Sequence, residues 1–279
     1  MHLVWLTLTV ILITGLVGAL LLYYVSKRFA VDENPVVEEI ARLLPGANCG
    51  GCGFKGCHDF AATCASADSL AGIYCPVGGQ ALMKRVSEIV GLDAGVVEPT
   101  VAVLKCHGCA DVRPRMAVYD GVSSCSVMAA TAVGETGCAY GCLGCGDCQA
   151  VCAYGAIVVS PVTGLPEIDP ARCTSCGKCV RACPRHLIEL RPRGKRDRRV
   201  WVACSSRDRG AVARKVCGVA CIGCGKCAKI CPFGAVAVTD NLSYIDPSLC
   251  RTCGKCVEVC PTGAILSTFK QKDYEPTDI

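Results

Sequence analysis

The sequence predicts an α+β protein in which one membrane-spanning helix precedes several small domains, instead of a single large globular core. The first 26 residues contain no Asp, Glu, Lys or Arg, which indicates a membrane segment. Cysteine accounts for 27 of the 279 residues, and most of these cysteines recur in two stretches with nearly the same spacing. Aromatic residues make up only 5% of the chain, so the remainder can form several small cores but hardly one large core.

Residues 1–26 are expected to be a retained membrane anchor. The stretch 3–25 consists mostly of Leu, Val and Ile, and as a helix it is long enough to cross a hydrocarbon core of about 30 Å. Lys27 and Arg28 follow directly and predict that the bulk of the chain lies on the cytoplasmic side of the inner membrane. A cleaved signal peptide is the alternative, but the segment lacks a basic start and a small-residue cleavage site. We therefore expect a single-pass protein that contacts lipid through this helix.

The rest of the chain divides at changes in composition. Residues 36–44 and 81–91 have helical spacing of apolar residues, and residues 101–104 read as a strand. The expected regions are a small helical Gly-rich domain (34–97), a Cys-containing connector (98–133), a first module (134–190), a basic linker (191–215), a second module (216–268) and a polar tail (269–279).

The two modules are an internal repeat. Each contains the run C-x2-C-x2-C-x3-C twice, and each has a further pair of cysteines upstream with the spacing C-x12-C. This spacing aligns Cys125 with Cys204 and Cys138 with Cys217. Only the loop inside each module changes length, which indicates duplication of one unit.

The repeated run is typical of bacterial ferredoxins, in which the fourth Cys of each run ligates the other of two [4Fe–4S] clusters. We therefore expect crossed ligand sets, two in each module. Pro184, Pro232 and Pro261 follow the fourth Cys in three of the four runs, as in the bacterial signature. Structural zinc is the alternative, but zinc sites pair two distant C-x2-C motifs. The expected sets are Cys142, Cys145, Cys148 with Cys183; Cys173, Cys176, Cys179 with Cys152; Cys221, Cys224, Cys227 with Cys260; and Cys250, Cys253, Cys256 with Cys231.

The helical domain carries a different cysteine pattern that predicts a fifth [4Fe–4S] cluster. Four glycines lie between or beside its first three cysteines, where they let the backbone close around a cluster and donate N–H groups to its sulfides. A zinc ribbon is the alternative. Cys64 lies off the pattern and is expected to be a buried core residue. The expected ligands are Cys49, Cys52, Cys57 and Cys75.

Six further cysteines lie outside these five sites. Cys204 and Cys217 lack a companion C-x2-C, and two thiolates cannot hold a cube, so they are expected to be buried structural residues. His107 is expected at the surface. Five clusters are therefore expected. The remaining four cysteines could hold a sixth: Cys106, Cys109, Cys125 and Cys138.

Charge is divided unevenly along the chain. Residues 101–279 contain 23 basic and 15 acidic side chains, whereas residues 26–100 contain 6 and 9. Six of the nine residues in 191–199 are basic, which would either attract an acidic electron carrier or form a solvated linker. No aromatic side chains interleave with these charges, so nucleic-acid binding is not expected. The sequence has no G-x-G-x-x-G after a strand, no P-loop and no Ser/His/Asp order, and hence no expected catalytic residue.

The order of these parts resembles the B subunit of the Rnf complex, an ion-translocating ferredoxin:NAD oxidoreductase. The resemblance rests on the anchor, on the Gly-rich domain with Cys75-Pro76-Val77-Gly78-Gly79, and on Gly141-Cys-Leu-Gly-Cys-Gly-Asp-Cys148. It covers essentially the whole chain, although many members have one ferredoxin module and this sequence looks like a longer form. The combination with the anchor is specific, because ferredoxin motifs alone occur in many proteins.

The resemblance implies an electron-transfer subunit of a redox-driven translocase, with no bond of a substrate changed on this chain. Electrons would pass from soluble reduced ferredoxin through the [4Fe–4S] clusters towards other membrane subunits and a flavin- and NAD-binding subunit. Two alternatives remain open. One is an iron–sulfur subunit of another membrane enzyme, such as a formate dehydrogenase, and the other is a structural iron–sulfur scaffold.

Overall fold

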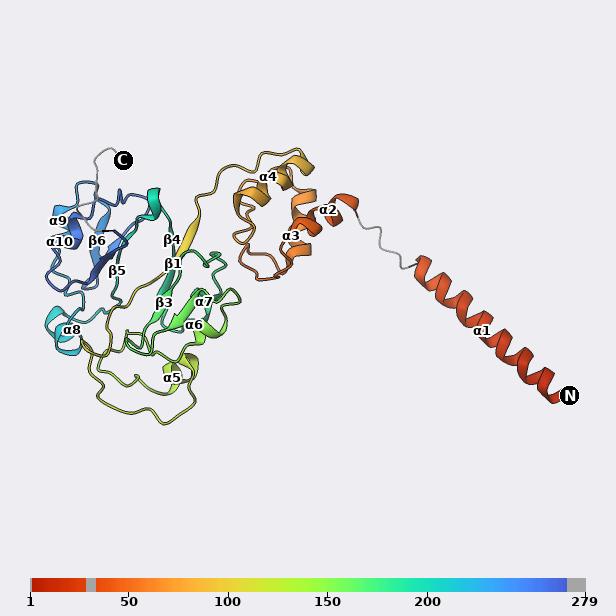
Figure 1. Cartoon of the computed structure of the whole chain (residues 1–279), viewed down its shortest axis with the longest axis horizontal. Coiled ribbons are helices and arrows are strands. Elements are labelled where there is room, and N and C mark those ends of the chain that lie inside the picture. The colour runs from red at the N-terminus through yellow and green to blue at the C-terminus, as the bar shows by residue number, and fades with distance from the viewer. Residues whose placement is uncertain (1, 29–33, 270–279) are drawn as a thin grey trace.

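The computed structural model describes residues 2–28 and 34–269. Helix α1 (His2–Arg28) comes first, a domain of three helices follows, and two small modules of short strands and helices lie at the far side of that domain (Figure 1). This mixture of helices and strands agrees with the predicted α+β class.

Helix α1 stands apart from the other elements and is exposed along its length. The stretch Trp5–Arg28 has a mean hydropathy of 2.3 and no buried residue, and its length and composition suit a membrane span. The hydroxyls of Thr9 and Thr14 donate hydrogen bonds to the carbonyls of Trp5 and Val10, one turn earlier. These two hydroxyls are thus satisfied within the helix.

The Gly-rich domain packs three helices around one core. Asn34 caps α2 by accepting a hydrogen bond from the Val36 N–H at 3.0 Å, and α4 ends at Gly91, whose φ of 76° is left-handed. Phe60 and Met83 are almost completely buried between the helices. The two helices predicted from spacing are confirmed, and a third begins at Cys57: α2 (Pro35–Leu43), α4 (Gly79–Val90) and α3 (Cys57–Ser66).

The first module is built from two antiparallel strand pairs. Strand β1 (Thr100–Leu104) lies in the predicted connector, yet it pairs with β4 (Ile188–Pro192) at the end of the module. The inner pair is β2 (Ile157–Val159) with β3 (Pro166–Ile168). The helices of this region are α5 (Cys125–Thr131), α6 (Asp147–Ala150) and α7 (Lys178–Ala182).

The second module repeats this arrangement. Strand β5 pairs with β8 as the outer pair, and β6 pairs with β7 as the inner pair. Three short helices accompany them. The bounds are β5 (Val200–Val202), β6 (Val236–Thr239), β7 (Leu242–Ile245), β8 (Ile265–Ser267), α8 (Gly210–Val216), α9 (Lys226–Ile230) and α10 (Lys255–Glu258).

The strand register corrects the alignment of the repeat. Leu104 pairs with Ile188 and Val202 pairs with Ile265, and in each module the second residue lies five positions after the last Cys of the module. Strands β1 and β5 are therefore equivalent. Cys204, two residues after β5, corresponds to Cys106 and not to Cys125. The alignment by the C-x12-C spacing alone was wrong, because it ignored these strands.

The basic stretch 191–199 is a packed joint between the modules. It contains part of β4 and a short 3-10 helix (Lys195–Asp197). Lys195 and Arg196 are exposed, so the expected attraction for an acidic carrier can rest on these two side chains but not on the whole stretch. Three of its arginines, which the charge pattern suggested as surface residues, are 3–7% exposed: Arg191, Arg198 and Arg199.

Hydrogen bonds across this joint fix the modules to one another. The Arg191 guanidinium donates to the carbonyls of Val200 and Ile245 in the second module, at 3.1 and 2.8 Å. In the opposite direction, the Trp201 indole N–H donates to the Leu104 carbonyl at 2.9 Å. The two modules therefore have a fixed relative position.

Candidate metal centres

In the second module, eight thiols line two neighbouring cavities of about 340 and 320 Å³. Gly225 and Gly254, with φ of 70° and 76°, turn the chain between the second and third Cys of each run, so that the sulfurs face one space. Each cavity takes three cysteines from one run and the fourth from the other, which is the crossed arrangement. The two sets are Cys221, Cys224, Cys227, Cys260 and Cys231, Cys250, Cys253, Cys256.

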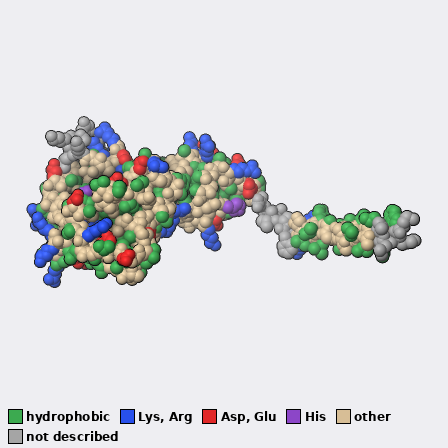
Figure 2. Space-filling view, turned by 60° about the horizontal axis from the view of Figure 1, so that its bottom comes forward, with side chains coloured by type: hydrophobic (Ala, Val, Ile, Leu, Met, Phe, Trp, Pro, Cys, Tyr) green, Lys and Arg blue, Asp and Glu red, His purple; other side chains and the backbone are tan. Residues whose placement is uncertain are grey.

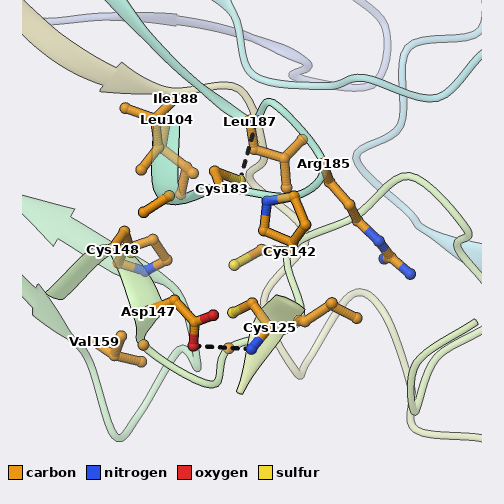
Figure 3. A pocket seen from close by; sticks show the side chains of 16 residues that line it. Leu104, Cys125, Cys142, Asp147, Cys148, Val159, Cys183, Arg185, Leu187 and Ile188 are labelled. Atoms are coloured by element: carbon orange, nitrogen blue, oxygen red, sulfur yellow. Dashed lines mark hydrogen bonds between the residues drawn. The ribbon is translucent and has the colours of Figure 1, made fainter. Parts of the chain in front are cut away.

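In the first module, a cavity of about 420 Å³ is lined by Cys142, Cys148 and Cys183, again from both runs (Figure 3). The Leu187 N–H donates to the Cys183 sulfur at 3.3 Å. Cys125 also lines this cavity, and its thiol contacts Cys145. Burial and then the Cys125 thiolate raise the pKa of Cys145 to about 11. The cavity is therefore lined by Cys125 and three of the four expected cysteines, and Cys145 lies beside Cys125 without lining it.

The second thiol set of this module lies around Cys179. Burial and then the neighbouring Cys173 and Cys176 thiolates raise the pKa of Cys179 to about 12. Cys152, from the other run, packs in the same apolar cluster as Cys173 and Cys179, and its sulfur accepts the Ala156 N–H at 3.3 Å. Cys152 therefore lies in a cluster with two thiols of the second set and with Cys148 of its own run.

The Gly-rich domain gathers its own set of thiols. Cys75 lies near Cys49 and Cys52, and burial followed by their charges raises its pKa despite two backbone N–H groups that act in the opposite direction. The Gly51 N–H points at the Cys49 sulfur at 3.5 Å, and the Cys57 N–H donates a hydrogen bond to the Asn48 side-chain oxygen at 2.8 Å.

Cys64 is completely buried in the core of the same domain. Burial, and then the charges of Cys52 and Cys75, raise its pKa to about 11, as expected for a neutral thiol among apolar side chains. The prediction that Cys64 is a core residue is confirmed.

The Gly-rich domain contacts the first module at its thiol set. A Cβ atom on Gly51 would lie 2.8 Å from the Cys176 carbonyl oxygen and 2.9 Å from its Cα, so only glycine allows this approach. The Arg181 guanidinium donates to the Cys49 carbonyl at 3.4 Å. The ligand loops of the two sets, around Cys49 and Cys176, are thus in direct contact.

These surroundings fit clusters better than single ions. In residues 2–28 and 34–269, no group of three or more His, Cys, Asp or Glu side chains is arranged to hold one metal ion. The thiols instead surround cavities, and backbone N–H groups point at their sulfurs, as they do around an iron–sulfur cube.

The structure does not gather the expected sixth set around one cavity. Cys125 lines the 420 Å³ cavity described above, whereas Cys106 and Cys138 line another of about 360 Å³ together with Cys204 and Cys217. Cys109 packs beside Cys106 without lining that cavity. In both modules a Cys lies two residues after the first outer strand. This shared pattern was the sequence signal that could have paired Cys106 with Cys204. His107 is exposed, as predicted.

Comparisons with known proteins agree with these sites. A family model described as a 4Fe-4S dicluster domain matches residues 141–187, 172–235 and 220–264, and one described as a putative Fe-S cluster matches residues 44–68. The matches cover both modules and the start of the Gly-rich domain.

Similar whole proteins come from several organisms. The chain is 45% identical over 237 residues to the B subunit of the Na(+)-translocating ferredoxin:NAD(+) oxidoreductase complex of Acetobacterium woodii, covering 85% of this chain and 70% of the relative. It is 39% identical over 250 residues to the B subunit of the proton-translocating ferredoxin:NAD(+) oxidoreductase complex of Clostridium ljungdahlii, covering 90% and 87%. The B subunit of the ion-translocating oxidoreductase complex of Methanosarcina acetivorans is 39% identical over 239 residues, covering 85% and 88%. The chain therefore belongs to the family of B subunits of ion-translocating ferredoxin:NAD(+) oxidoreductase complexes, the Rnf family that its motifs resemble.

Proposed function

We propose that this chain is a membrane-anchored electron-transfer subunit that takes electrons from reduced ferredoxin and passes them to other subunits of an Rnf-type complex. The observation that carries the proposal is the contact between the ligand loops of the Gly-rich domain and of the first module, together with the hydrogen-bonded joint that fixes the first module to the second. The five expected sets of four cysteines are the proposed cluster ligands. When bound, [4Fe–4S] clusters supply one-electron redox chemistry.

The residues of the chain position and shield these centres. Backbone N–H groups directed at cysteine sulfurs, such as those of Gly51 and Leu187, stabilise added negative charge there. Burial of Cys179 and Cys256 keeps water away from these two thiols. The close approach of Gly51 to Cys176 shortens the path between two of the centres.

We place the docking site for ferredoxin at the thiol set of the second module that contains Cys224. All 27 cysteines lie in described residues, and Cys224 alone among them is exposed. Lys226 and Lys229, both exposed, follow it on α9, whereas the residue equivalent to Lys226 in the first module is Asp147. An acidic carrier would therefore be attracted to the most accessible centre. Figure 2 shows that other Lys and Arg side chains lie at several separate places on the modules.

A stopped-flow experiment tests this docking site. Exposed charge pairs contribute about 0–1 kcal/mol each and are screened beyond about 8 Å at physiological salt, so the effect should appear in the association rate. The double variant Lys226→Glu/Lys229→Glu should accept electrons from reduced ferredoxin roughly tenfold more slowly at low salt, with a flatter salt dependence. Lys84→Glu/Arg85→Glu, two exposed residues of the Gly-rich domain, gives the same change in charge and should leave the rate unchanged. Equal rates for both variants across a salt series would exclude the site.

We propose that α1 anchors the chain in the cytoplasmic membrane with residues 27–279 on the cytoplasmic side, where ferredoxin is available. The support is the exposed apolar surface of α1 and the basic pair Lys27-Arg28 directly after it. The helix would contact lipid and the membrane subunits, and a flavin- and NAD-binding subunit would receive the electrons. Reporter fusions after residue 279 should be active only on the cytoplasmic side, and the opposite result would reverse the proposed orientation.

Metal analysis tests the cluster assignment as a whole. Anaerobically purified full-length chain should contain at least about 20 Fe and an equal amount of acid-labile sulfide, from five clusters of four irons. A content near 8 Fe, or zinc in place of iron, would contradict the assignment. A chain that contains the clusters but is not reduced by ferredoxin would instead be a structural scaffold.

A further inference from the structure

A cavity of about 360 Å³ between the two modules is lined by four thiols that no ferredoxin run includes. Two come from the first module and two from the second. Its volume falls between those of the cavities at the proposed cluster sites, which are about 320, 340 and 420 Å³. The four thiols are those of Cys106, Cys138, Cys204 and Cys217.

These four residues form two equivalent pairs. Cys106 and Cys204 each lie two residues after an outer strand, and the residue before each of them donates its N–H to the end of the module at 2.7 Å. Cys138 and Cys217 each precede the first cysteine run by the same three-residue spacing, and each accepts a backbone hydrogen bond from the third residue after it. Each module therefore supplies half of a set of four, and neither module alone can close it.

Each pair is linked to the nearest cluster run of its own module. The Cys142 N–H donates to the Cys106 sulfur at 3.4 Å. In the same way, the Cys221 N–H donates to the Cys204 sulfur. Cys142 and Cys221 are the first cysteines of equivalent runs. The cavity thus lies between the two inner thiol sets that face the joint, one from each module.

A buried arginine provides positive charge at this cavity. Arg113 lines it and is 8% exposed, and its Nη2 atom donates to the Cys142 carbonyl at 2.8 Å. Its Nε and Nη1 atoms have no hydrogen-bond partner within the described part of the chain. A buried guanidinium without an anion is costly, so these atoms indicate a negatively charged occupant. No Asp or Glu among the described residues lines the cavity to serve as that anion.

Two glycines leave room for groups that line the cavity. A Cβ atom on Gly108 would lie 3.1 Å from the Cys217 sulfur, and one on Gly141 would clash with the Arg113 guanidinium. A side chain at Gly108 would therefore crowd the Cys217 thiol, and one at Gly141 would displace Arg113 from the cavity.

We propose that Cys106, Cys138, Cys204 and Cys217 hold an additional [4Fe–4S] cluster, shared by the two modules. Four thiolates and a cube give the negative charge that Arg113 lacks. Resting on the proposed electron-transfer function, this centre accepts one electron from the inner site of one module and passes one to the inner site of the other, so it undergoes no net change. It joins the two modules into one uninterrupted path.

Iron analysis of full-length variants tests the proposal. Wild-type chain should contain about 24 Fe, whereas Cys204→Ala and Cys217→Ala should each contain about 20 Fe with a matching loss of sulfide. Cys109→Ala is the matched control, because Cys109 belongs to the same C-x2-C pair as Cys106 but does not line the cavity. Its iron content should equal that of wild type.

Several outcomes would overturn the proposal. The first is a loss of iron in the Cys109→Ala control but not in Cys217→Ala. The second is a wild-type content of about 20 Fe that no variant changes. The third is one zinc per chain that disappears in Cys217→Ala. A wild-type content far below 20 Fe would instead contradict the five-cluster assignment itself. Should the alanine variants fail to fold, iron anomalous scattering from wild-type crystals decides the question by showing iron density, or none, beside Cys217.

Discussion

Arg191 should be the residue on which the rigid connection of the two modules depends most. Its side chain is 3% exposed and forms an ion pair with Glu189, while its two Nη atoms donate to the carbonyls of Val200 and Ile245. The Tyr244 ring lies 5.3 Å from the guanidinium carbon. We consider the change Arg191→Met, which keeps an unbranched apolar stem and removes the guanidinium with all of its donors.

The expected cost follows from these contacts. Hydrogen bonds from a charged group contribute about 1.5–3 kcal/mol each, and two of them cross the joint. The Glu189 carboxylate keeps Lys105 as a partner at 3.5 Å, so it is not left without a cation. The loss should therefore be about 3–5 kcal/mol, the range for breaking a buried ion pair. At 1.4 kcal/mol per factor of ten, local opening of the joint becomes at least about a hundredfold more frequent.

Hydrogen–deuterium exchange of the full-length chain measures this opening directly. The Ala203 N–H, which bonds the Ala264 carbonyl at 2.7 Å, should exchange about a hundredfold faster in Arg191→Met, because β5 and β8 lose their attachment to the first module. Lys195→Met is the control, since Lys195 is exposed. In this variant the Ala203 N–H should exchange at the wild-type rate. Exchange of Ala203 within about threefold of wild type in Arg191→Met would show that the joint does not depend on this arginine.

Two other predictions concern the ligand loops. Cys152→Ser should perturb the spectroscopic signal of the cluster held by Cys173 and its run, and leave the cluster of its own run intact; the reverse result in spectra that resolve the two clusters would refute crossed ligation. Gly51→Val should separate the Gly-rich domain from the first module, because its Cβ would lie 2.8 Å from the Cys176 carbonyl oxygen. We expect weaker magnetic interaction between the two centres in electron paramagnetic resonance at unchanged iron content, and an unaltered interaction would contradict the contact.

The thiol sets could be anticipated from the sequence because local spacing brings the ligands of an iron–sulfur cube together. The outer strand pairs could not, since β1 and β4 are far apart in the chain and their pairing depends on the closed module. Charge was equally ambiguous. Arg198 and Arg199 look the same in the sequence as Lys195, yet they are buried, where Arg199 pairs with Asp197 and Arg198 lies 5.3 Å from the Phe269 ring centroid.

The placement of Cys125 beside the first run was missed for a related reason. Cys125 reaches its position because its N–H and the neighbouring Ser124 and Ser126 all donate to the Asp147 carboxylate. This anchor lies more than twenty residues away in sequence. Spacing between cysteines holds no information about such a contact.

The outer strand pairs also impose an order on assembly during synthesis. The first module cannot close its outer pair until residue 192 has left the ribosome, and the second cannot do so until residue 267 has emerged. A chain that ends between these points could complete one module and would present Cys106 and Cys138 without their counterparts beside β5 and α8. Whatever loads iron into this protein would therefore meet finished sites in the first module early, and the joint between the modules last.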